Sequence, residues 1–194
     1  MNSSLQILLK ARPETGTDWR GALGKLASTH RFSIESCHAS LTGSEIYCYL
    51  STAGDPADSA REIEASARKA LSDPALSASA LLPLIRFDGP AHGAVAPFHY
   101  VVETNVDAGN EAGLNDWYNI EHLPGLAAVP GCAWAARFRN LSHEPRYIAC
   151  YDLASPETVE RPEWLAVRNT EWSSRVRPNF RGTKRTMFRR LPQN

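Results

Sequence analysis

The stretch DGPAHGAVAP, residues 88–97, separates two halves of the chain that can be compared element by element. It is rich in Gly, Ala and Pro, a composition typical of a link between folded segments. The predicted strands and helices on its two sides follow the same order. We therefore expect two domains, residues 1–90 and residues 97–194, joined by this link.

In the first half, four runs rich in β-branched and aromatic residues predict strands over 5–12, 32–41, 45–52 and 78–87. Helices are predicted between them, over 15–30 from the apolar spacing and over 55–72 from a run rich in Ala, Glu and Arg. Asp55 is suited to cap the second helix, and Pro56 fits its first turn. The predicted order is β-α-β-β-α-β.

The second half repeats this order. Strands are predicted over 97–106, 131–140, 145–154 and 183–191. Helices are predicted over 115–123 and 155–177, with Asn115 and Ser155 as N-caps. Because six elements recur in the same order, the pattern indicates an internal duplication.

A β-α-β-β-α-β unit is the ferredoxin-like arrangement, with both helices on one face of an antiparallel sheet. The other face must also be covered. We therefore predict an α+β protein in which two ferredoxin-like units pack sheet to sheet, as an intramolecular dimeric α+β barrel. The space between the two sheets would then be a natural pocket for a small molecule.

The stretch NDWYNIEHLPGLAAVPG, residues 115–131, carries the strongest candidate site. Pro124 disfavours helical conformation at Leu123, so the helix is expected to end near His122. Tyr118 and His122 would share a face, four residues apart. At a helix C-terminus the dipole favours a protonated histidine, which makes His122 a candidate acid or base with Tyr118 as hydrogen-bond donor. The alternative is a solvated helix end on which Trp117 serves only for packing.

The predicted strand FHYVVETNV, residues 98–106, carries polar residues on one face. Strand alternation puts His99 and Glu103 on that face together with Val101. The two side chains could line the pocket as an acid–base or orienting pair. The alternative is a sheet surface that faces water.

Composition and motifs exclude several classes of function. Hydrophobic residues make up 43% of the chain, and 21 basic residues balance 21 acidic ones, so no excess charge points to nucleic acid. No apolar run is long enough to span a membrane, and the first residues lack the features of a secretory signal, so we expect a cytoplasmic protein. Phosphate loops, nucleophile elbows and Cys/His metal spacing are absent from the sequence, and its four cysteines are expected to be buried free thiols.

The basic residues between Arg175 and Arg190 could bind an anionic ligand. The alternative is a solvated surface, balanced by acidic residues of the preceding segment. The sequence leaves both interpretations open.

The motif stretch resembles the signature of the ethyl tert-butyl ether degradation (EthD) family of the dimeric α+β barrel superfamily. The resemblance covers about residues 97–191 and rests on Trp117-Tyr118, Glu121-His122-Leu123-Pro124, Val129-Pro130-Gly131, Arg137 and Phe138. It implies a functional His122. The superfamily includes muconolactone isomerases, polyketide cyclases, cofactor-free monooxygenases and heme proteins. The first half shows only Asp18-Trp19 of this signature, so one site per chain is expected.

These observations predict a protein that binds a small apolar or aromatic molecule and catalyses proton transfer without a cofactor or metal. His122 and Tyr118 are the expected catalytic residues. Substrate contacts are expected from Trp117, His99, Glu103, Arg137 and Trp134. A non-catalytic binding or accessory protein is the alternative, and heme binding through a histidine is a third hypothesis. No nucleic-acid or membrane partner is expected, and the chain would be a monomeric pseudo-dimer or a homodimer.

Overall fold

The computed structural model describes residues 6–12, 14 and 16–192. The chain divides into two compact units. Unit 1 contains the described residues up to Pro83, residues 140–143 and the described residues from 189 onward. Unit 2 contains residues 84–139 and 144–188. The change from one unit to the other thus falls inside the strand β4 (Ser77–Asp88), because this strand continues without interruption through Pro83.

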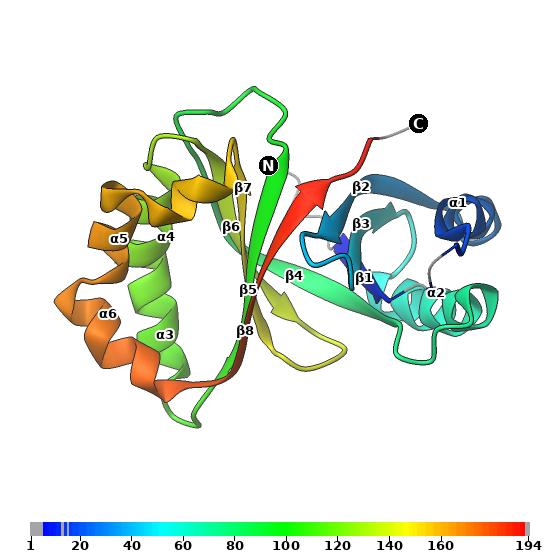
Figure 1. Ribbon diagram of the computed structural model, residues 1–194. Coiled ribbons are helices and arrows are strands. Elements are labelled where there is room, and N and C mark those ends of the chain that lie inside the picture. Colours follow the sequence, from blue (N-terminus) through cyan, green and yellow to red (C-terminus); the bar gives the residue numbers. More distant parts are fainter. Residues whose placement is uncertain (1–5, 13, 15, 193–194) are drawn as a thin grey trace. The chain divides into compact units, whose positions relative to one another are not determined.

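Unit 1 is a four-stranded antiparallel sheet with two helices. Its strands lie in the order β4-β1-β3-β2, and the two helices lie side by side (Figure 1). The elements are β1 (Gln6–Ala11), α1 (Trp19–His30), β2 (Phe32–Ser40), β3 (Ile46–Thr52), α2 (Pro56–Leu71) and the first part of β4. Leu5, the first residue of the predicted first strand, lies outside the described residues.

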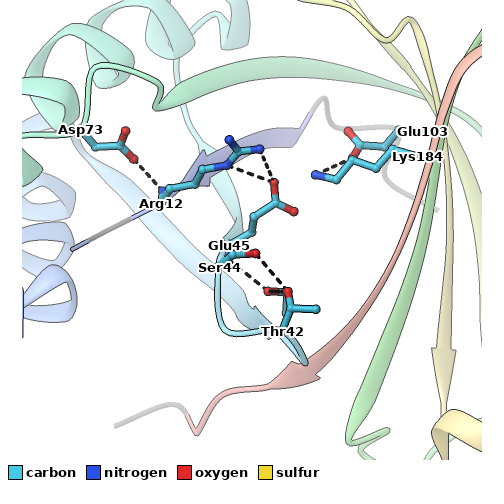
Figure 2. A network of polar contacts seen from close by, with 8 residues as sticks. Arg12, Thr42, Ser44, Glu45, Asp73, Glu103 and Lys184 are labelled. Carbon is cyan, nitrogen blue, oxygen red and sulfur yellow. Dashed lines mark hydrogen bonds and ion pairs between the residues drawn. The ribbon is translucent and has the colours of Figure 1, made fainter. Parts of the chain in front are cut away.

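Local signals in unit 1 agree with the structure at the start of α2. The Asp55 carboxylate accepts hydrogen bonds from the backbone N–H groups of Ala57 and Asp58, so the predicted cap is confirmed. At the end of β1, the guanidinium of Arg12 lies 2.8 Å from Glu45 (Figure 2). The backbone N–H of Arg12 donates to Asp73 at 2.6 Å.

One prediction about the cysteines is wrong. Cys37 and Cys48 form a disulfide, because β2 and β3 pair in a register that places the two residues directly opposite each other. Sequence spacing does not reveal such a cross-strand neighbour. Cys132 and Cys150 are buried free thiols, as expected.

Unit 2 has strands in the order β8-β5-β7-β6, and its helices all lie on one side of this sheet (Figure 1). Its first elements are β5 (Phe98–Val106), α3 (Glu111–Trp117), the π-helical turn η1 (Tyr118–His122), α4 (Leu123–Ala127), β6 (Cys132–Asn140) and β7 (Tyr147–Leu153). These are followed by the 3₁₀ turn η2 (Pro156–Glu160), α5 (Pro162–Arg168), α6 (Glu171–Val176), the 3₁₀ turn η3 (Arg177–Asn179) and β8 (Phe180–Arg190).

The motif helix differs from its prediction at both ends. It starts at Glu111 instead of Asn115, and it continues beyond His122 through η1 into α4. Leu123 is helical despite the proline that follows it. Pro124 is tolerated because it falls in the first turn of α4, where a missing N–H costs little.

The predicted helix over 155–177 is in fact several short pieces. Ser155 caps the first of them, as expected, by accepting a hydrogen bond from the Glu157 N–H. Pro162 opens a new helix and Thr170 caps the next one. Trp164 and Trp172 therefore lie on separate helices, α5 and α6.

Each unit thus combines an antiparallel sheet with helices, which confirms the α+β class. Apolar side chains fill a core of their own in each unit. The sheet-to-sheet packing of the two units stays a prediction. In the described part of the chain, no helix is both long and apolar enough to cross a membrane.

Candidate functional site

The sheet of unit 2 sorts the candidate residues onto two faces. In the register of β5 with β7, Tyr100 lies opposite Tyr151 and His99 lies opposite Asp152. Successive strand residues point to opposite faces, so these two pairs face opposite ways. The helix-facing side carries Tyr100, Tyr151 and Arg137. The other side carries the remaining predicted strand residues, His99, Glu103 and Trp134.

The π turn determines which side chains of the motif meet. In such a turn the backbone hydrogen bond spans five residues, and here the Leu123 N–H donates to the Tyr118 carbonyl. Residues five apart are thereby brought onto one face. Trp117 stacks on His122 with ring centroids 4.0 Å apart and an angle of 20° between the planes. Tyr118 contacts the same histidine edge-on at 5.4 Å.

Polar contacts hold the motif in position. The Trp117 indole N–H donates to the buried Ser173 hydroxyl at 3.2 Å. The Thr170 hydroxyl donates to the Glu121 carboxylate at 2.6 Å. These bonds join the motif helix to the start of α6.

His122 is buried and neutral. Burial, followed by the positive charges of Arg177, Arg168 and Arg137, lowers the pKa of His122 to about 3. The expected protonation by the helix dipole is wrong, because the helix does not end at this residue. Among the described residues, the Nδ1 atom of His122 has no hydrogen-bond partner. This nitrogen is therefore left without a hydrogen bond from these residues.

Arg137 supports Tyr118 from the sheet. Its guanidinium carbon lies 4.1 Å from the Tyr118 ring centroid and 5.5 Å from that of Tyr147. The guanidinium donates to Asn119 at 3.3 Å and to Asn115 at 3.1 Å. Burial raises the pKa of Tyr118 to about 12 despite the nearby arginines, so its hydroxyl stays protonated and can donate.

A small recess lies between the helices and the sheet of unit 2. Its cavity volume is about 30 Å³. A space of this size admits water and no larger molecule without rearrangement of the side chains around it. Its walls include His122 and a ring of aromatic side chains, namely Tyr100, Trp117, Tyr118, Tyr151, Trp164 and Phe180. The expected pocket was between two sheets, whereas this recess lies inside unit 2.

Arginines also line the recess: Arg168, Arg177 and Arg185. Burial and the other two arginines lower the pKa of Arg177. The basic residues between Arg175 and Arg190 were open to two interpretations, an anion-binding site or a solvated surface balanced by acidic residues. Arg175 pairs with Glu171 and Arg181 pairs with Asp107, whereas Arg177 and Arg185 line the recess.

The opposite face of the sheet carries a buried charge pair. His99 Nδ1 lies 2.6 Å from the Asp152 carboxylate, and both side chains are buried. Burial alone would lower the pKa of His99, but the hydrogen bonds and charges of Asp152 and Cys150 raise it to about 9. His99 is therefore protonated at neutral pH.

Glu103 and Trp134 accompany this pair on the same face. Glu103 lies 4.0 Å from the Lys184 ammonium (Figure 2). The Trp134 ring centroid lies 6.0 Å from that of His99. Because His99 and Glu103 are buried, the alternative of a water-facing surface is wrong. The sheet itself separates these residues from His122.

Sequence reasoning missed Asp152, Arg168 and Tyr100 as site residues. A usable signal existed for Asp152, which is a lone acidic residue in the apolar run YIACYDL and therefore needed a buried partner. Arg168 and Tyr100 reach the recess from segments far apart in the sequence, and no local pattern marks them. Within the described part of the chain, no cluster of three or more His, Cys, Asp or Glu residues is placed to hold a metal ion.

Comparisons with known proteins establish the fold. An anthrone oxidase-like protein is similar over 98% of this chain and 92% of its own, with a TM-score of 0.64 and 13% identity. A mutant chlorite dismutase from Candidatus Nitrospira defluvii, in complex with cyanide, covers 99% of this chain and 92% of its own, with a TM-score of 0.65 and 9% identity.

A ferredoxin-fold protein from Listeria monocytogenes, related to antibiotic biosynthesis monooxygenases, covers 98% of this chain and 96% of its own, with a TM-score of 0.53 and 8% identity. No family model matches the chain, and no curated protein matches it. The similarity therefore confirms the α+β fold with ferredoxin-like neighbours, and it carries no activity with it.

Proposed function

We propose that unit 2 binds a small apolar or aromatic molecule in the recess on the helix side of its sheet. Trp117 forms a wall of the site, Tyr118 is a hydrogen-bond donor and His122 is the proton acceptor. The proposal includes a relationship of this chain to the EthD family, whose signature this stretch resembles. The observation that carries it is the buried His122, whose Nδ1 atom lacks a partner in the described part of the chain while its ring lines the recess.

The chemistry best suited to these residues is proton transfer without a cofactor, as in isomerisation or cyclisation. A neutral imidazole can take a proton from an acidic carbon of the substrate and return it at another position. The Tyr118 hydroxyl can donate a hydrogen bond to the oxygen on which negative charge develops. The surrounding arginines disfavour imidazolium in the empty site, and a substrate anion would offset that effect.

A non-catalytic binding role is the second candidate. The observation that favours it is the small volume of the recess, about 30 Å³. In this role the same recess would hold a ligand, and His122 would act only as a hydrogen-bond acceptor.

Thermal-shift measurements with phenols, lactones and aromatic acids test the binding proposal. A ligand should stabilise the wild type, and the shift should fall in His122→Asn and Tyr118→Phe. His92→Asn is the matched control, since His92 is an exposed histidine of the same unit with no place in the recess. Equal shifts in all four proteins would contradict the assignment.

Catalysis is tested separately from binding. A lactone that binds is incubated in D₂O, and loss of its C–H signal is followed by proton NMR. The proposed proton transfer predicts exchange that depends on His122 and is absent in His122→Asn. Binding without any His122-dependent exchange would favour the non-catalytic role.

A further inference from the structure

Three guanidinium groups from separate elements meet at the recess. Arg168 ends α5, Arg177 opens η3 and Arg185 lies in β8. None of the described residues that line the recess is an aspartate or glutamate. The positive charges of these three arginines therefore gather at the recess, although the chain as a whole has no net charge.

Neighbouring arginines of the same unit are neutralised by carboxylates. Arg175 pairs with Glu171, Arg181 with Asp107, and Arg146 with Glu111 at 2.6 Å. Within the described residues, the three recess arginines have no such ion pair. Arg177 donates instead to the backbone carbonyl of Arg168 at 3.0 Å.

The three charges act on one another and on the site. Burial, then Arg168 and Arg185, lower the pKa of Arg177, as expected for like charges held close together. Tyr100 and His122 also experience this positive field. Such an arrangement is unfavourable when empty and becomes favourable when an anion enters.

We propose that the recess selects a small aromatic carboxylate, whose anionic group is held by Arg168, Arg177 and Arg185. This inference rests on the proposed function, since it names the substrate class of the same recess. A guanidinium presents a planar pair of donors that matches the two oxygens of a carboxylate. The aromatic walls, including Trp117 and Tyr100, provide the surface for the ring.

The size of the recess limits what can enter it without rearrangement. Its volume of about 30 Å³ is smaller than an aromatic ring, so binding requires the aromatic side chains that line it to move apart. The proposal places the carboxylate against the arginines and the ring against these aromatic side chains.

Titration calorimetry with benzoate, benzamide and benzyl alcohol tests the inference on the full chain. Benzoate should bind more tightly than the two neutral analogues, and its affinity should fall as salt is added. Arg185→Gln should weaken benzoate by about tenfold or more, the loss expected for a charge-assisted hydrogen bond, and leave the neutral analogues unchanged. Arg185 is exposed, so this variant should fold.

Arg175→Gln is the matched control. It removes the same charge from α6 of the same unit, but Arg175 pairs with Glu171 and does not line the recess. Its benzoate affinity should equal that of the wild type. Equal losses in the two variants would mean that only overall charge matters, and would overturn the inference.

The remaining outcomes separate the two proposals. If benzyl alcohol binds as well as benzoate, and His122→Asn weakens both, the recess is a binding site without anion selectivity; the inference then fails and the proposed function stands. If none of the three probes binds at millimolar concentration, both fail together. Tight binding of benzoate that Arg185→Gln does not weaken would also overturn the inference.

Discussion

Two histidines of unit 2, on opposite faces of one sheet, illustrate how neighbours determine charge. Both are buried, yet the pKa of His99 is raised to about 9 and that of His122 is lowered to about 3. His99 has a carboxylate 2.6 Å away. His122 has an indole stacked on it and arginines around it.

The difference shows that burial alone does not determine the role of a histidine. A buried histidine with a carboxylate partner forms a fixed ion pair, and this suits it to structural support. A buried neutral histidine with an unpaired nitrogen can accept a proton from a ligand. We therefore propose that His99 stabilises the unit and that His122 belongs to its site.

The largest expected effect comes from removing the carboxylate. Asp152→Asn removes the carboxylate that lies 2.6 Å from His99, and the loss of one partner of a buried pair costs roughly 3–5 kcal/mol. Urea unfolding at pH 7 measures the free energy of unfolding. Glu111→Gln, which removes one partner of an exposed pair, is the control and should cost less than about 1 kcal/mol. A similar loss of unfolding free energy in the two variants would contradict the view that His99 belongs to a buried, stabilising ion pair.

The stability of the protein at alkaline pH tests the same ion pair of His99 and Asp152. The folded-state pKa of His99, about 9, lies above its usual value of 6.5, so the folded state binds the proton more tightly. The stabilisation is complete below pH 6.5 and is lost as pH rises through 9, by about 3 kcal/mol. Unfolding at a series of pH values measures this loss. Asp152→Asn should show a much flatter curve in this range.

His122 predicts the opposite dependence at acid pH. Its folded-state pKa is depressed to about 3, so the unfolded state binds the proton more tightly. Its contribution is present above pH 6.5 and is lost as pH falls toward 3, by about 2 kcal/mol on reaching pH 5. The difference in stability between wild type and His122→Asn should shift by this amount between pH 7 and pH 5. A constant difference would show that His122 titrates normally.

The smallest expected effect concerns the support of the Trp117–His122 stack. Ser173→Ala leaves the buried indole N–H without its acceptor, which costs about 1–2 kcal/mol. Ser174→Ala on the same helix is the control, because Ser174 is exposed and bonds only locally. The free energy of unfolding and the tryptophan fluorescence of both variants measure the effect. An equally small change in both would mean that the hydrogen bond adds nothing to the stack.

Local signals in the sequence predicted much of the fold. The β-branched and aromatic runs matched each strand to within a few residues, as β2 (Phe32–Ser40) and β6 (Cys132–Asn140) illustrate. The N-cap at Asp55 was also correct. These features depend on residues close together along the chain, so the chain alone is enough to predict them.

Other features depended on tertiary structure. The π turn brings Trp117 onto His122, and the helix continues through Pro124, which lies in the first turn of α4. The pairing of Cys37 with Cys48 required the register of two strands. Local sequence patterns could predict neither the π turn nor the disulfide.

The sequence by itself determined the α+β class of the protein, and it predicted a candidate site on the motif around His122. Only the tertiary structure decided which residues share a face of the sheet and which charges surround each histidine. Asp152 reaches His99 from 53 residues away in the chain. Electrostatic energy depends on distance in space and on burial, and neither quantity can be obtained from the order of residues along the chain.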